Sequence, residues 1–160
     1  METTRHFVAT VYVVNEGAIA LHHHDKLDMW LPPGGHLHRD ELPHEAARRE
    51  VSEETGHDVD LLAAPGDVSS DTVRELPQPR QFLLEDIDYV GDEVAHQHVD
   101  FVFYGTVRNR TIDPEDGEQP SDDWEWVTAE TLRNDPDRFE PDVIEFGQDA
   151  IRTVEARSER

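Results

Sequence analysis

Apolar residues recur along this chain with two different spacings, and each spacing predicts one kind of secondary structure. Short runs rich in Val, Phe, Tyr and Ile, some alternating with polar residues, are typical of β-strands. We expect strands at residues 6–14, 18–24, 59–64, 80–87, 98–107 and 124–127. The first two are separated by Asn15, Glu16 and Gly17, which favour a hairpin turn.

Helical spacing predicts three helices, at residues 42–55, from about residue 129, and at residues 142–157. Thr128 is the expected N-cap of the second helix. The third has one apolar side, made of Val143, Ile144, Phe146, Ile151 and Val154. Strands interleaved with helices indicate an α/β protein of the α+β kind, with residues 1–160 forming a single domain.

The helix at residues 42–55 has clear start and stop signals. Asp40 is its expected N-cap, Pro43 is tolerated because it falls in the first turn, and Gly56 suits a left-handed C-terminal cap. Before the helix, residues 30–35 form an extended approach that ends in Gly34 and Gly35. Glycines there let the backbone come close to a metal or a phosphate.

Three carboxylates crowd one face of this helix. Glu50, Glu53 and Glu54 stand at i, i+3 and i+4, while Glu45, Arg48 and Ser52 point to the opposite, solvent side. The acidic side is shared with Ala46, Ala47 and Val51. Like charges in partly buried positions repel, and Mg²⁺ or Mn²⁺ would remove that cost. The alternative interpretation is a solvated helix in a very acidic protein.

Residues 35–57 read GHLHRDELPHEAARREVSEETGH and fill the frame G-x5-E-x7-R-E-U-x-E-E-x-G-U, where U is aliphatic. The matching residues are Gly35, Glu41, Arg49, Glu50, Val51, Glu53, Glu54 and Gly56. Only the last aliphatic position departs, with His57 at a packing slot. The pattern resembles the MutT-type Nudix box of Mg²⁺-dependent hydrolases, which cut diphosphate linkages in nucleotide-like compounds. It implies the Nudix fold, a mixed curved β-sheet sandwiched between helices.

The resemblance also implies a role for each matching residue. The implied metal ligands for Mg²⁺, or Mn²⁺, are the carboxylates of Glu50, Glu53 and Glu54 and the carbonyl of Gly34. Glu50 is also a candidate base, Arg49 is expected to orient the carboxylates, and Glu41 has a supporting role. A further acidic ligand is expected near Trp124, from Asp122, Asp123 or Glu125. Of these three, Glu125 is chosen by a narrow margin as the further ligand. The alternative is that Glu125 is one more acidic residue on the surface.

The chain carries 37 acidic and 14 basic residues, a net charge of −23, and no cysteine. Such a composition resembles that of proteins from extreme halophiles. It disfavours binding to duplex nucleic acid or anionic membranes, and the lack of cysteine excludes thiol chemistry. No membrane-spanning run or signal peptide is seen, so we expect a cytoplasmic protein. The oligomeric state stays open, with a homodimer allowed.

The substrate is not encoded in the box. Compactness favours a nucleoside triphosphate derivative, while ADP-ribose, a dinucleoside polyphosphate or a non-catalytic ligand-sensing role remain alternatives. An isoprenoid diphosphate isomerase of this fold is expected to carry a cysteine, which this chain lacks. The loops at residues 65–79 and 108–123 are expected to select the substrate. Trp30, Phe82 and Tyr104 are candidates for base stacking, with core packing as the default.

Histidines gather in several short segments: residues 22–24, His36, His38, His96 and His98. Their spacings match no closed zinc motif, so surface or structural roles are the simplest interpretation. The side chains of His96 and His98 are expected on one strand face, where His36 or His38 could join them to line a pocket. Such histidines are also suited to contact a phosphate.

The charge predicts that the fold depends on salt. At molar salt the Debye length is about 3 Å, so repulsion among the carboxylates is screened. We expect the protein to lose structure in dilute buffer and to keep it in concentrated KCl, as measured by circular dichroism during dialysis. Full retention of structure in dilute buffer would contradict the halophilic interpretation.

Overall fold

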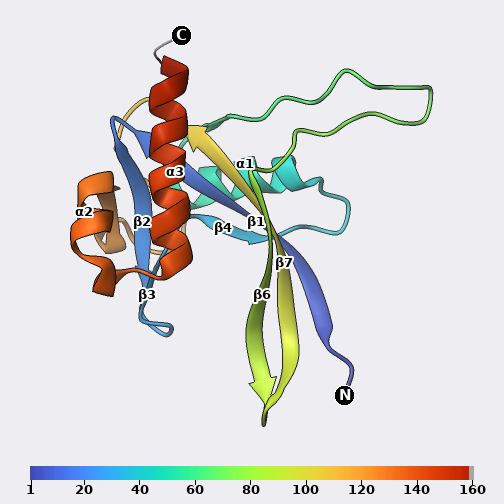
Figure 1. Cartoon of the computed structure of the whole chain (residues 1–160), viewed down its shortest axis with the longest axis horizontal. Coiled ribbons are helices and arrows are strands. Elements are labelled where there is room, and N and C mark those ends of the chain that lie inside the picture. The colour runs from blue at the N-terminus through green and yellow to red at the C-terminus, as the bar shows by residue number, and fades with distance from the viewer. Residues whose placement is uncertain (159–160) are drawn as a thin grey trace.

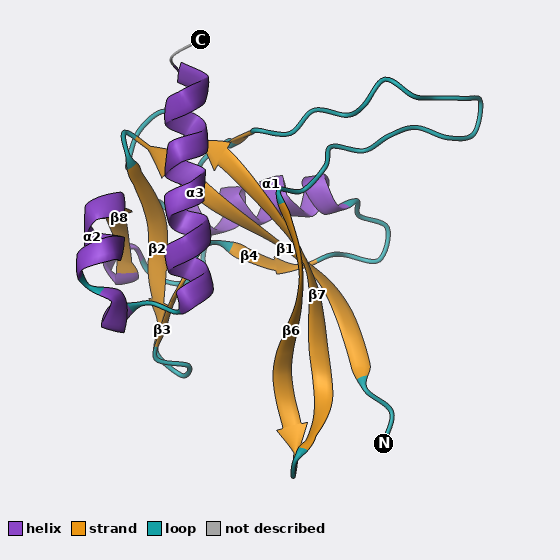
Figure 2. Cartoon of the chain, in the orientation of Figure 1, coloured by secondary structure: helices purple, strands orange, loops and turns teal. Residues whose placement is uncertain are grey.

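The computed structural model describes residues 1–158 and shows a mixed β-sheet held between helices (Figures 1 and 2). The strands are β1 Thr4–Asn15, β2 Ala18–His24, β3 Met29–Leu31, β4 Gly34–His36, β5 Asp60–Leu61, β6 Gln81–Val90, β7 Glu93–Thr106 and β8 Trp124–Thr128. The helices are α1 Pro43–Thr55, α2 Ala129–Asn134 and α3 Pro141–Ser158, with short 3-10 turns η1 Ser121–Asp123 and η2 Pro136–Arg138. This arrangement confirms the predicted fold class.

The long strand β1 organises the sheet. It runs parallel to β7 along almost its whole length, from the Thr4–His96 pair to the Val14–Thr106 pair. On its other side β1 pairs antiparallel first with β4 and then, at its end, with β2. The central order is β3-β2-β1-β7-β5, with β8 beside β2 and β6 beside β7. Only the short loop at residues 37–42 separates β4 from α1, so the pairing of β4 with β1 limits where the acidic helix can begin.

Alternating side chains of the sheet supply two cores. Ala9, Val11 and Val13 of β1 pack against the α1 side, and Tyr12 and Val14 pack against α2 and α3. Phe103 and Val102 repeat this alternation on β7. A strand buried on both faces reads as a continuous apolar run, which explains the sequence of residues 8–14. All five residues expected on the apolar side of α3 lie in or against the core.

The six predicted strands are all present, with two changes of length. The segment at 59–64 forms only the two-residue strand β5, which pairs with the end of β7. The β6–β7 hairpin is longer than predicted, turns at Gly91 and extends beyond the helices (Figure 1). In its outer part Asp86 and Asp88 alternate with Ile87 and Tyr89, and all four side chains are exposed, so no buried face set the length of this strand.

Helix α1 starts two residues later than the Asp40 cap predicts. Its N-cap is Leu42, held in an extended conformation by the proline that follows it. A Glu45 carboxylate oxygen accepts a hydrogen bond of 2.9 Å from the Leu42 amide, which replaces the expected Asp40 contact. The other predictions hold: Pro43 is the first helical residue, and Gly56 ends the helix with φ of 78°.

No helix within residues 1–158 is long and apolar enough to cross a membrane.

Candidate active site

Arg49 gathers the acidic residues of α1 into one network. Its guanidinium donates two hydrogen bonds to Glu41, of 2.8 and 2.9 Å, and one each to Glu50 and Glu53, of 3.0 and 3.1 Å. It donates a further bond of 2.9 Å to the backbone carbonyl of His36. The bond from Arg49 is the main reason that the pKa of Glu41 is lowered. One arginine therefore fixes three carboxylates and the end of β4.

The two glycines of β4 bring backbone against these carboxylates. A Cβ atom at Gly35 would overlap the Glu50 carboxylate, so a larger residue there would force that carboxylate out of its position. The Gly34 amide donates a hydrogen bond of 3.1 Å to Glu54. Bonds of the β1–β4 ladder are made by neighbours such as Pro33 and Leu37, so the backbone groups of Gly34 are directed away from β1. This orientation suits a Gly34 carbonyl that binds a cation.

Burial makes the carboxylates costly in their charged form. The pKa of Glu54 is raised to about 9, first by burial and then by the charge of Glu50. The pKa of Glu50 is also raised by burial, although the neighbouring Arg49 charge opposes the shift. Partly buried oxygen donors at such close spacing are the environment that a hard divalent cation stabilises. The residues present therefore fit Mg²⁺ or Mn²⁺.

A fourth glutamate reaches the cluster from the loop at residues 108–123. Backbone bonds tie this loop to the end of α1, from Asp113 to Thr55 and from Glu115 to Glu53, at 3.0 and 2.8 Å. The negative charge of Glu118 contributes to the raised pKa of both Glu50 and Glu54. Sequence reasoning missed Glu118 because several acids of this loop look alike, and only the chain path distinguishes them.

Glu125, the acid chosen narrowly from the sequence, does not join the cluster. Glu125 and Val127 lie on the same face of β8, and Val127 packs on the side of α2 and α3. Glu125 forms an ion pair with Arg138. Asp123 instead accepts a hydrogen bond of 2.7 Å from the Gln119 side chain. Among the acids near this region, Glu118, before η1, is the one whose charge acts on Glu50 and Glu54.

The other sequence candidates separate into buried and exposed groups. Tyr104 is buried, and its hydroxyl donates to Asp149 at 2.7 Å, so its core packing is as expected. Phe82 is 68% exposed and stacks on Phe101. Trp30 is partly buried, with the Arg138 guanidinium 5.2 Å from its ring. Phe82 is therefore more open to a ligand than Tyr104.

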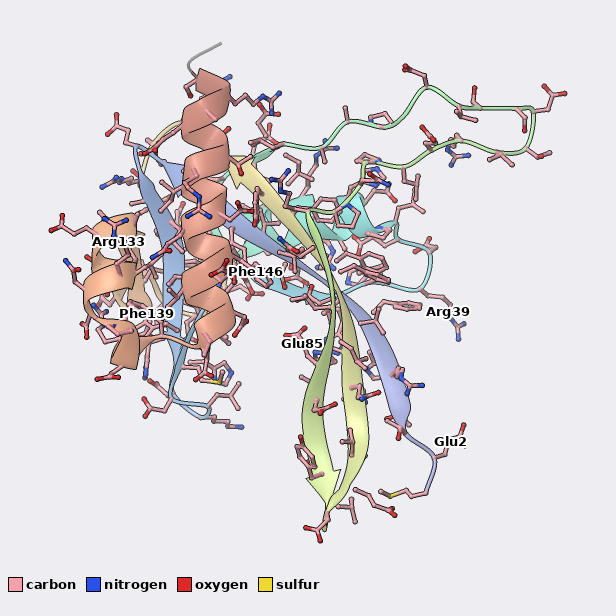
Figure 3. The ribbon with its side chains drawn as sticks, in the orientation of Figure 1. Glu2, Arg39, Glu85, Arg133, Phe139 and Phe146 are labelled. Carbon is pink, nitrogen blue, oxygen red and sulfur yellow. The ribbon has the colours of Figure 1, made fainter. Side chains whose placement is uncertain are left out.

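The sheet face opposite α1 carries a second acidic position that sequence reasoning also missed. Asp100 is only 4% exposed, and one of its oxygens accepts a hydrogen bond of 2.8 Å from Thr10. Burial and the neighbouring Glu85 raise its pKa to about 8. Figure 3 shows Glu85 on β6, at the base of the protruding hairpin. These acids lie across the sheet from the Arg49 network.

The histidines fall into two groups. His22 is buried against Trp124, and burial lowers its pKa to about 4. His36, His96 and His98 are brought together with His6 on one sheet face. The pKa of His98 is lowered to about 4, first by burial and then by His36 and His96. The expected grouping of His36 with His96 and His98 is thus observed.

The chain matches the model of the NUDIX domain over residues 4–149. A solved Nudix-family hydrolase from Clostridium perfringens is 29% identical, with 94% of this chain and 99% of that chain covered and a TM-score of 0.79. A MutT protein from Methanosarcina mazei Go1 shares 18% identity over 100% and 99% of the two chains, with a TM-score of 0.61.

The E. coli dihydroneopterin triphosphate pyrophosphohydrolase shares 15% identity over 93% and 92% of the two chains, with a TM-score of 0.56. These last two similarities show the fold alone. No curated protein sequence matches the chain. With the domain model matched over nearly its whole length and the box residues assembled around Arg49, the chain belongs to the Nudix family, as a hydrolase of acid anhydrides in phosphorus-containing compounds.

Proposed function

We propose that this hydrolase is a Mg²⁺-dependent pyrophosphohydrolase, able to use Mn²⁺, that cleaves a nucleoside triphosphate derivative. The observation that carries the proposal is the cluster of Glu50, Glu53, Glu54 and Glu118, in which one arginine balances only part of the negative charge. Oxygen donors of this kind select a hard cation over a softer one.

In the proposed site Glu50, Glu53 and Glu54, with the Gly34 carbonyl, hold the cation. A cation bound there would neutralise the diphosphate oxygens and would lower the pKa of bound water. Arg49 keeps Glu50 and Glu53 in fixed orientations through its hydrogen bonds and does not need to touch the substrate. Glu50 is the candidate base that accepts the proton of the attacking water.

The preference for a triphosphate rests on a structural neighbour and on the loops around the site. The E. coli dihydroneopterin triphosphate pyrophosphohydrolase, by its name, acts on a triphosphate, and this chain shares its fold. The long loops at residues 62–80 and 107–120 connect β5 to β6 and β7 to η1, and we expect them to contact the leaving group. ADP-ribose and dinucleoside polyphosphates are the competing substrates.

A panel assay tests the proposal directly. Nucleoside triphosphates, ADP-ribose and dinucleoside polyphosphates are incubated with the enzyme in concentrated KCl, with and without Mg²⁺ or Mn²⁺, and products are identified by mass. We expect metal-dependent release of pyrophosphate from a triphosphate. Cleavage of ADP-ribose alone would overturn the substrate preference, and full activity in a chelator would overturn the metal dependence.

Glu53→Gln is expected to lower turnover by about 10²-fold or more while the fold is retained, because a neutral amide is a poor replacement for a carboxylate ligand. Glu145→Gln, at an exposed position of α3, is the matched control and should keep full turnover. Steady-state kinetics at saturating Mg²⁺ give the comparison. Equal turnover in the two variants would remove Glu53 from the metal site.

A second pair of variants asks which acid completes the site. Glu118→Gln should raise the Mg²⁺ concentration needed for half-maximal activity, since it removes a charge that acts on Glu50 and Glu54. Glu125→Gln breaks only the ion pair with Arg138 and should leave that concentration unchanged. If instead Glu125→Gln raised that concentration and Glu118→Gln did not, Glu125 would be the further acid, as chosen from the sequence.

The raised pKa of Glu54 also predicts how stability depends on pH without metal. Between the ordinary glutamate range and pH 9 the folded state binds more protons than the unfolded state, so stability falls as pH rises. Asp100 contributes in the same direction. Glu54→Gln should therefore raise the Tm at about pH 8.5. The rise should be roughly 2–4 °C for each kcal/mol gained in the free energy of unfolding, with little gain near pH 5.

Thermal unfolding in a chelator, measured across this pH range, checks the prediction. Addition of Mg²⁺ should raise the Tm of the wild type more than that of Glu54→Gln, because the variant has lost a ligand. Identical pH profiles for the two proteins would show that Glu54 is charged without cost in the folded state.

A further inference from the structure

We propose that His6, His36 and His96 form a second metal site, for a divalent transition-metal ion such as Zn²⁺, separate from the carboxylate site on α1. The three side chains come from three different strands, β1, β4 and β7. Each offers a ring nitrogen, and these nitrogens all lie within 4.8 Å of one another.

The register of the sheet creates this grouping. His6 is paired with His98 in the β1–β7 ladder, and His96 is paired with Thr4, so both histidines of β7 lie on the same face as His6. On β4, His36 is paired with Val8, two residues from His6 and therefore also on that face. Ring centroids are 4.6 Å apart for His6 and His96, and 5.3 Å apart for His6 and His36.

A neighbouring hydroxyl orients one of the three rings. The Thr4 hydroxyl donates to the Ala95 carbonyl at 3.3 Å and lies 2.8 Å from Nδ1 of His96. When the hydroxyl gives its single proton to the Ala95 carbonyl, Nδ1–H of His96 is the donor to the hydroxyl. In that arrangement the lone pair of His96 is on Nε2, where it can bind a metal, and such an outer partner is typical of histidine ligands.

Imidazole nitrogens select the class of metal. They suit Zn²⁺, Ni²⁺, Cu²⁺ or Co²⁺, whereas Mg²⁺ prefers oxygen. Ligands of a tetrahedral Zn²⁺ ion at about 2.0–2.1 Å stand roughly 3.3 Å apart, so the rings need to close by about 1 Å or a little more. His6 and His36 are exposed and His96 is partly exposed, which allows that movement and leaves a fourth position for water.

This site is distinct from the carboxylates, although β4 connects the two. The Cβ direction of Gly35 faces Glu50, so the next side chain, His36, projects from the opposite face of the sheet. The backbone carbonyl of His36 accepts a hydrogen bond from Arg49. A metal held by the His36 ring would therefore stiffen the strand that also positions the Arg49 network.

An open pocket of about 430 Å³ lies beside the triad and gives it an entry path. Its lining includes His6, His36, His38, Arg5 and Arg39. Figure 3 shows Arg39 on the loop between β4 and α1, at the outer edge of the molecule. His98 is the fourth histidine of this group. Its ring centroid lies 4.8 Å from that of His36 and 5.2 Å from that of His96, so its ring supports both.

Zn²⁺ titration of the full chain, by competition with a chromophoric chelator in concentrated KCl, tests the proposal. Excess Mg²⁺ is present throughout to occupy carboxylate sites. We expect one Zn²⁺ per chain in the wild type and in Glu53→Gln. Loss of a residue that only hydrogen-bonds to a metal ligand weakens metal binding by about 10–100-fold. His96→Ala and His6→Ala each remove a ligand itself, so each should weaken Zn²⁺ binding by at least that factor.

His24→Ala is the matched control, because His24 lies at the end of β2 within another run of histidines. It should bind Zn²⁺ like the wild type. Loss of binding in His24→Ala with retention in His96→Ala would move the site to residues 22–24 and overturn the proposal. So would the absence of stoichiometric binding in the wild type.

The absorption spectrum of bound Co²⁺ tests the site even if a histidine variant folds poorly, because it is recorded on the wild type. Co²⁺ bound by the wild type should give visible absorption bands typical of nitrogen ligands at low coordination number, and Thr4→Val should weaken Co²⁺ binding without removing a ligand. A Co²⁺ spectrum typical of six oxygen ligands would contradict the histidine site. Since neither readout uses turnover, the result is independent of the proposed hydrolase reaction.

Discussion

The structure depends most on the contacts of one guanidinium group. Arg49 is bound to Glu41, Glu50 and Glu53 and to the carbonyl of His36, so it links both ends of the box to β4. A planar guanidinium with five donors can hold several oxygens in fixed directions, which a lysine cannot. The single positive charge still leaves the cluster with excess negative charge, and this excess is what a metal ion would neutralise.

The fold serves this cluster by placing backbone where a side chain would not fit. Strand β4 pairs with the middle of β1, and its two glycines lie against the carboxylates of α1. The apolar side of α1, with Ala46, Ala47 and Val51, fixes the helix on the sheet. Burial then raises the pKa of Glu54, so the packing that positions the helix also creates the electrostatic cost at its acidic face.

Local patterns predicted most of the elements and the box helix, while contacts between distant segments could not be predicted. Gly56 and the buried face of α1 follow from spacing within about fifteen residues. Leu42 replaced Asp40 as the N-cap because the proline after it sets the backbone. Glu118 depends on the path of a loop, which is not visible along the sequence. The grouping of His36 with His96 and His98 was expected, but the place of His6 beside them depends on the register of three strands.

The proposed binding of a metal ion by the carboxylate cluster is tested most directly by counting protons when the ion binds. Mn²⁺ is added to the metal-free protein in weakly buffered concentrated KCl near pH 7.5, and the pH change is recorded. Because the pKa of Glu54 is about 9 without metal, the carboxyl is protonated and must release its proton as the ion binds. The account predicts release of nearly one proton per Mn²⁺ in the wild type and much less in Glu54→Gln. Tight binding of Mn²⁺ with no proton release, or no binding in a folded sample, would contradict it.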